Sequence, residues 1–295
     1  MRALPLIALL ILCSGSACAQ DTVAISKCYA PQVGEWTIEG CNAIIAQGGV
    51  SARSRAVAFR SRGLGYHLVR GEIDRAIEDF DESLRIQPDN LEAFLNRGAA
   101  YYDKSDYDRA LEDFGEAIRV GPRDTRGVYD RGNTYLAKGR FDLAIRDFDA
   151  TIALDPYHAL AYANRCWARA ADGPLETALD DCNAALKIEQ RSTYALNGRG
   201  VTHLKLGDLP AAFADFNRSL AIEQRNAFGL YGRGVTLRRM GHVEEGSADV
   251  DAAKACTDVR PRNFAGTGSR TSTCCVLSQG NALLPCCKRL ICLIE

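Results

Sequence analysis

Apolar residues recur along most of the chain at spacings of three and four positions, with polar residues between them. Such spacing places apolar side chains on one face of an α-helix. The amphipathic stretches come in pairs, and a glycine or another turn residue stands between the two members of each pair. Because glycine ends helices and permits the chain to reverse, the pattern predicts helical hairpins and an all-α fold.

The hairpins repeat with a period of 34 residues. Repeats 2 to 6 begin at Leu91, Thr125, Ala159, Thr193 and Ala227, and repeat 1 begins near Ala56 with one extra residue in its turn. One hairpin cannot bury its apolar face alone, so neighbouring repeats are expected to stack on one another. The turns are expected at Gly71, Ser105, Gly139, Gly173, Gly207 and Gly241.

Three columns of the repeat hold residues of a characteristic size. Position eight is small: Gly63, Gly98, Gly132, Cys166, Gly200 and Gly234. Position twenty is small: Ala76, Ala110, Ala144, Ala178, Ala212 and Gly246. Position twenty-four is mostly a large knob: Phe80, Phe114, Phe148, Cys182, Phe216 and Val250. These columns resemble the tetratricopeptide repeat (TPR) over about residues 56–256. The resemblance implies an α-α superhelix, a TPR solenoid of about six hairpins that forms one elongated body.

Two further columns carry opposite charges. Position seven is arginine in all six repeats, and position twenty-three is aspartate in all six. On antiparallel helices these positions lie opposite each other, so we expect a structural ladder of ion pairs, within hairpins or between neighbours. The alternative is a stripe of arginines that binds phosphate or carboxylate groups. The expected pairs are Arg62 with Asp79, Arg97 with Asp113, Arg131 with Asp147, Arg165 with Asp181, Arg199 with Asp215, and Arg233 with Asp249.

The balance of charge excludes one class of partner. The 295 residues include 36 basic and 37 acidic side chains, which argues against a nucleic-acid-binding protein. An apolar fraction of 47% is ordinary for a chain that buries a core, so wholesale disorder is not expected.

The N-terminus predicts export. Met1-Arg2 precedes an apolar run, and Ala17-Cys18-Ala19 has the pattern of a signal-peptide cleavage site. The expectation is a signal peptide at 1–19, cleaved after Ala19, and a periplasmic or secreted mature chain with no transmembrane helix. The alternative is an outer-membrane lipoprotein in which Cys18 carries the lipid.

Twelve cysteines fit an exported protein, and their positions sort them into groups. Cys166 and Cys182 replace the consensus residues of facing positions in one repeat, which predicts a disulfide. A second disulfide, Cys28 to Cys41, is expected in an N-terminal cap at 20–55, where residues 37–47 look like the second helix of a degenerate repeat. Residues 257–295 form a cysteine-rich tail, expected to be poorly ordered or aberrant, with disulfides or a metal site as alternatives.

The sequence contains no motif for catalysis, for a cofactor or for a metal, and its four histidines lie apart, so it is not expected to be an enzyme. The TPR resemblance instead implies a non-catalytic scaffold that binds a protein or peptide partner in a concave groove. The partner and the oligomeric state stay open, and an acidic chaperone tail is disfavoured because the groove positions do not reproduce the carboxylate clamp. The alternatives are a lipid-anchored component of an envelope assembly or secretion machine and metal handling by the tail cysteines. The groove is expected to be lined by Arg60, Tyr129, Asn133, Trp167, Tyr194, Asn197, Phe228 and Tyr231.

Overall fold

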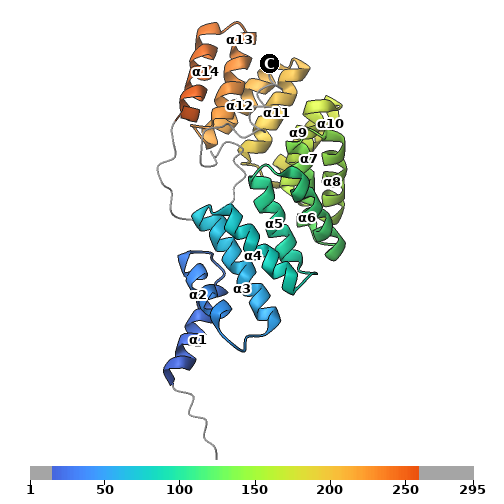
Figure 1. The fold of residues 1–295 in the computed structure, drawn as a ribbon. Helices are drawn as coiled ribbons and strands as arrows, with labels where there is room; N and C mark the ends of the chain where they lie inside the picture. The colour runs from blue at the N-terminus through green and yellow to red at the C-terminus, as the bar shows by residue number, and fades with distance from the viewer. Residues whose placement is uncertain (1–14, 259–295) are drawn as a thin grey trace, which may run out of the picture. The chain divides into compact units, whose positions relative to one another are not determined.

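The computed structural model describes the backbone of residues 15–258 and the side chains of residues 22–256. Most of the predicted signal peptide and the tail beyond residue 258 lie outside this range, and so do Cys13, Cys274, Cys275, Cys286, Cys287 and Cys292. Within it, every regular element is helical, which confirms the expected all-α fold (Figure 1).

The described elements follow one another as consecutive helices. They are α1 (Gly15–Cys28), α2 (Glu35–Ala46), α3 (Ala52–Gly65), the π-helix η1 (Tyr66–Arg70), α4 (Ile73–Ile86), α5 (Leu91–Asp103), α6 (Tyr107–Val120), α7 (Thr125–Ala137), α8 (Phe141–Leu154), α9 (Ala159–Asp172), α10 (Leu175–Ile188), α11 (Thr193–Leu206), α12 (Leu209–Ile222), α13 (Ala227–Arg239) and α14 (Val243–Asp258).

The helices pack as hairpins, α3 with α4 through to α13 with α14, as the period predicts. Backbone contacts divide the chain into a first unit, residues 1–122, and a second unit, residues 123–295. The first unit holds the N-terminal hairpin and repeats 1 and 2, and the second holds repeats 3 to 6. Within each unit the second helix of one repeat also packs on the first helix of the next.

The second helices show why the apolar spacing produces this packing. In α4 the buried residues are Ala76, Asp79, Phe80, Ser83 and Leu84, at successive separations of three and four that fall on one helix face. The first helices begin at polar caps that accept a hydrogen bond from the first turn. These caps are Ser51, Asn90, Asp124, His158, Ser192 and Asn226.

The turn column behaves as expected at five of its six positions. Gly71, Gly139, Gly207 and Gly241 have φ between 67° and 94°, and Ser105 has φ of 62°. This left-handed conformation reverses the chain after a helix and favours glycine. Gly173 is the exception, with an extended φ of −163°, because the next residue is Pro174 and a residue before proline avoids the helical region.

The extra residue of repeat 1 lies in a different place from the one expected. The turn itself is ordinary, and the additional residue is absorbed before it, in the π-helix η1. A π-helix accommodates one more residue per turn than an α-helix, so the insertion widens the end of the first helix and leaves the reversal at Gly71 unchanged.

The N-terminal cap is a complete hairpin of α1 and α2. The sulfur atoms of Cys28 and Cys41 are 2.09 Å apart and join the two helices. Gly40 lies so close to α1 that a Cβ atom there would be 2.7 Å from the backbone nitrogen of Cys28. The hairpin is tied to α3 by the Tyr29 hydroxyl, which donates to the carbonyl oxygen of Ser54 at 3.0 Å.

Candidate functional site

The arginine and aspartate columns meet inside each hairpin. In all six repeats the arginine donates through Nε and Nη2 to the two carboxylate oxygens of the matching aspartate, over 2.5–3.0 Å. The aspartates of repeats 1 to 5 are buried, so these are two-pronged charge-assisted bonds between helices. The hydrogen bonds that Arg131 donates to Asp147 raise the pKa of Arg131, whereas burial raises the pKa of Asp79 although the bonds from Arg62 oppose that shift.

The same arginines also bond to a second column of acceptors on the preceding repeat, which the sequence analysis did not identify. Nη1 of Arg165 donates to Asp149 of the preceding repeat at 2.5 Å, and Nη1 of Arg199 donates to Asn183 at 2.7 Å. The bonds from Arg97 to Asp81, from Arg233 to Asn217 and from Arg62 to Asn42 follow the same pattern. A column of Asp or Asn two residues after the ladder aspartate was the available signal, interrupted by Gly115 in repeat 2. Because Nε and Nη2 of every ladder arginine already bind aspartate, the ladder is not an open anion-binding stripe.

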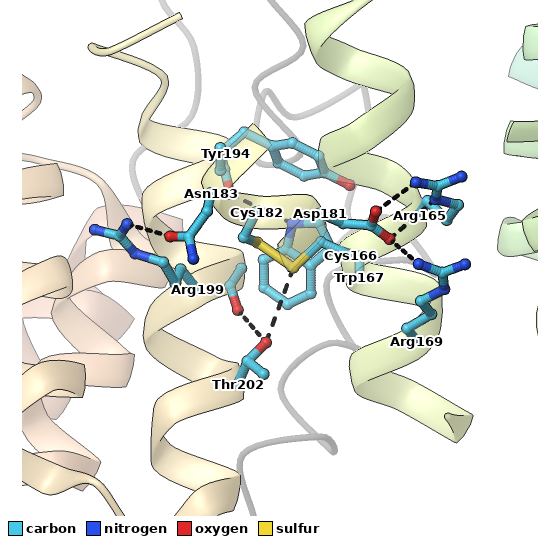
Figure 2. The surroundings of a disulfide bond; sticks show 12 residues. Arg165, Cys166, Trp167, Arg169, Asp181, Cys182, Asn183, Tyr194, Arg199 and Thr202 are labelled. Atoms are coloured by element: carbon cyan, nitrogen blue, oxygen red, sulfur yellow. Dashed lines mark hydrogen bonds and ion pairs between the residues drawn. A yellow bond between two sulfur atoms is a disulfide. The ribbon is translucent and has the colours of Figure 1, made fainter. Parts of the chain in front are cut away.

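Repeat 4 departs from the others around its disulfide (Figure 2). The sulfur atoms of Cys166 and Cys182 are 2.10 Å apart, and both residues are fully buried. Beside them, the Trp167 indole is 1% exposed and donates from Nε1 to the carbonyl oxygen of Tyr194 at 3.3 Å. Arg169 adds a second guanidinium to the ladder, 2.7 Å from Asp181.

In the second unit, amide and aromatic side chains link successive first helices. Asn164 on α9 donates from Nδ2 to Asn133 at 2.6 Å and to the Tyr129 hydroxyl at 3.1 Å, both on α7. Tyr194 on α11 packs on Trp167, with ring centroids 5.7 Å apart, and Tyr231 on α13 packs on the same apolar cluster. We call this surface the first-helix face and define it by the partly exposed Tyr129, Asn133, Tyr194 and Tyr231, with Asn164 buried beneath Asn133.

The expected groove residues divide into two sets in the structure. Tyr129, Asn133, Tyr194, Tyr231 and Arg60 are partly exposed. Trp167, Asn197 and Phe228 are only 1%, 4% and 8% exposed, so their assignment to an open groove is corrected. Trp167 and Phe228 pack edge to face with centroids 5.2 Å apart, and Asn197 donates to Asn226 at 3.2 Å. These three residues support the face from beneath.

The first unit presents a different chemistry at the equivalent positions. Burial lowers the pKa of Arg60, and the charges of Glu92 and Tyr29 oppose that shift only in part. Asn96 occupies the repeat position of Asn164, but its counterparts of Tyr129 and Asn133 are Arg60 and Leu64, neither of which accepts a hydrogen bond. The Nδ2 atom of Asn96 is buried without a partner. The linked amides and tyrosine of the second unit therefore have no counterpart at these positions, where the expected groove residue is Arg60.

The described residues hold little that suggests chemistry beyond binding. Among them, no group of three or more His, Cys, Asp and Glu side chains is placed to hold a metal ion. None of the helices in the same part of the chain has the length and apolar character of a membrane span. The first-helix face can offer hydrogen bonds and aromatic contact area, which are means of recognition.

Models of the tetratricopeptide repeat match the sequence at residues 68–105, 91–124 and 129–193. No curated protein matches it. Similar solved structures include a tetratricopeptide repeat protein from Parabacteroides merdae, at 17% identity over 75% of this chain and 86% of that one, with a TM-score of 0.63. Another is YrrB, described as a TPR protein with an unusual peptide-binding site, at 19% identity over 66% and 98%, with a TM-score of 0.53. MamA from Desulfovibrio magneticus is 22% identical over 58% and 96%, also with a TM-score of 0.53. At these identities the likeness shows a shared fold.

Proposed function

Because the chain belongs to the tetratricopeptide repeat family of protein–protein interaction scaffolds, we propose that it binds a peptide or an extended segment of a partner protein on the first-helix face. The observation that carries this proposal is the arrangement of that face. Tyr194 and Tyr231 are partly exposed, and both pack on a buried cluster that includes Trp167 and Phe228. Rigid aromatic side chains give a large contact area at a low cost in conformational entropy.

The amides give this surface its polar component. Asn133 and Asn164 hold each other in a fixed orientation, and Asn133 is partly exposed. A side-chain amide carries two donors and two acceptor lone pairs, so it can bond to the backbone of an extended peptide. The similarity in fold to YrrB, a protein described as having a peptide-binding site, is consistent with this use of the fold. We expect no catalytic activity.

The test compares the wild-type protein with Tyr194→Ala combined with Tyr231→Ala. Partners crosslinked to the wild-type chain and recovered by affinity purification are expected to be lost from the double variant. The matched control is Tyr157→Ala, which removes a tyrosine that is 81% exposed and is not part of the first-helix face. Undiminished recovery of every partner by a folded double variant would refute binding on this face.

The place of action is a separate part of the proposal. The cleavage pattern before Gln20 supports a chain that acts in the cell envelope after export, and Cys18 supports the lipid-anchored alternative in an assembly or secretion machine. The mass of the mature N-terminus separates them. A chain that starts at Gln20 contradicts the lipid anchor, and a lipidated Cys18 contradicts the freely diffusing form.

A further inference from the structure

One first helix of the array begins at a cap that can gain a proton near neutral pH. The other caps are serine, asparagine or aspartate, but α9 is capped by His158. The N–H of Ala161 donates to Nδ1 of His158 at 3.2 Å. Because that N–H is a donor, the ring nitrogen facing it must carry a lone pair, and the histidine must be neutral for the cap to exist.

The capping ring also touches the surface proposed to bind a partner. The imidazole lies on the Tyr129 ring, with centroids 4.7 Å apart. The Tyr129 hydroxyl accepts a hydrogen bond from Asn164, which in turn holds Asn133. Tyr129 therefore connects the cap of α9 with Asn164 and Asn133 at the first-helix face.

We propose that His158 is an acid-sensitive switch of the first-helix face. A proton on Nδ1 removes the acceptor of the Ala161 N–H, and the two N–H groups then repel each other. The imidazolium must turn or withdraw, so its packing on Tyr129 changes as well. The amides held by Tyr129 lose their fixed orientation, and binding on this face weakens. This regulation rests on the proposed function, because it acts on the same surface.

Groups from three elements adjoin His158, and a hydrogen bond to its own backbone also raises its pKa. Its own loop contributes Asp155, whose negative charge favours the protonated ring. Helix α9 presents its N-terminus, which carries partial positive charge and disfavours it. Helix α7 presents the Tyr129 ring, which attracts a cation and favours it. Burial is the largest influence and lowers the pKa of His158 below its ordinary 6.5.

Because the pKa of His158 is lowered in the folded protein, the stability of the α9 cap must fall with falling pH. Because the unfolded chain takes up the proton at a higher pH than the folded chain does, acid favours the unfolded or locally opened form. The contribution of the cap is present above about pH 6.5, the ordinary histidine value. It is lost as the pH falls through the lower value of the folded protein.

The experiment measures amide hydrogen exchange of Ala161 in the full chain, one pH unit above and one below the titration midpoint of His158. NMR of the ring gives that midpoint, and comparison with His158→Asn identifies its signal among the four histidines. The wild-type protection factor, corrected for intrinsic exchange, is expected to fall roughly fivefold on the acid side, the size of one N-cap bond. The Asn164 side-chain amide signal should shift over the same range.

The matched variant replaces His158 by asparagine, the residue that caps two other first helices of this chain. Asn90 and Asn226 cap α5 and α13, so His158→Asn should keep the cap at both pH values and abolish the difference between them. His158→Ala should lack the protection at both. Equal wild-type protection on the two sides of the midpoint, or a midpoint at or above 6.5, would overturn the proposal. None of these measurements needs a partner, so a failure of the switch is distinguishable from a failure of peptide binding.

Discussion

Repeats 4 and 5 fill the same space by different means. In repeat 5 the ring of Phe216 lies against Gly200 of its own first helix and Gly232 of the next repeat. In repeat 4 the equivalent of Phe216 is Cys182, which is bonded to Cys166 in place of a glycine. Gly198 of repeat 5 holds the same repeat position as Gly232 of repeat 6. A Cβ atom on Gly198 would lie 3.1 Å from the sulfur of Cys182 and 3.0 Å from Nε1 of Trp167.

The difference shows that a repeat position specifies a volume more strictly than it specifies a residue. A cystine is smaller than a phenylalanine ring beside a glycine, and the space left over would be a cavity. Trp167 supplies the missing volume from the adjacent position of the first helix. Its counterpart in repeat 5 is Val201, which has no such space to fill.

The largest expected loss of stability comes from removing the Trp167 side chain, which fills the space beside the disulfide. Trp167→Ala should lower the free energy of unfolding by about 3–5 kcal/mol, because a fully buried aromatic side chain is lost. The matched substitution Val201→Ala removes about two methylene equivalents and should cost about 1.5 kcal/mol. Urea denaturation of both variants measures the contrast. Equal losses would mean that Trp167 does not compensate for Cys182.

A smaller effect is expected from the covalent bond. Replacing Cys166 and Cys182 together by alanine should cost about 2–4 kcal/mol, since the bond constrains the unfolded chain over a separation of 16 residues. Cys256→Ser is the control, because that cysteine is free, and its effect should stay below about 1 kcal/mol, since the side chain is only partly buried, against Leu220, Leu230 and Ala253. Thermal unfolding with and without a reducing agent provides the measurement. Reductant should destabilise the control more than the double alanine variant, because of the two disulfides between described residues only Cys28–Cys41 is left to break in that variant.

The smallest expected loss of stability comes from a hydrogen bond that repeats 4 and 5 both make to the repeat after them. Asn183 and Asn217 each accept a bond from the arginine of the following repeat, at 2.7 and 2.8 Å. Either asparagine changed to alanine should cost only about 0–1 kcal/mol, because both residues are exposed. Urea midpoints compared at low and high salt would check this. A loss above 2 kcal/mol from one substitution alone would show that the repeats differ here also.

Contacts between side chains could be predicted from the sequence where one repeat position keeps the same residue type in every repeat. Six arginines and six aspartates at fixed positions on antiparallel helices leave few other partners, and the paired cysteines of repeat 4 are informative for the same reason. The bonds between repeats escaped notice because their acceptor column mixes aspartate, asparagine and glycine. Any of these residues is ordinary on an exposed helix, so the column has no clear signature until distances are known.

The binding face was harder to predict, because exposure at a given position depends on the neighbouring repeat. Position nine holds Asn133 in one repeat, where it is partly exposed, and Trp167 in the next, where it is buried. Burial of Trp167 follows from the small volume of Cys182, fifteen residues later in the chain. A rule for single positions cannot express such a dependence. The same applies to Gly173, whose conformation was decided by Pro174.

The π-helix of repeat 1 has a consequence for how this array can change in evolution. Arg62 and Asp79 are one residue further apart than the pairs of the other repeats, and their bonds of 2.6 and 2.8 Å are nevertheless kept. A duplication or deletion of 34 residues preserves every rung, whereas an insertion of one residue would rotate all later side chains by about 100° if the α-helix simply continued. The widened turn at Tyr66–Arg70 confines that error to five residues. The first repeat thus carries one residue more than the others and keeps the same ion pair.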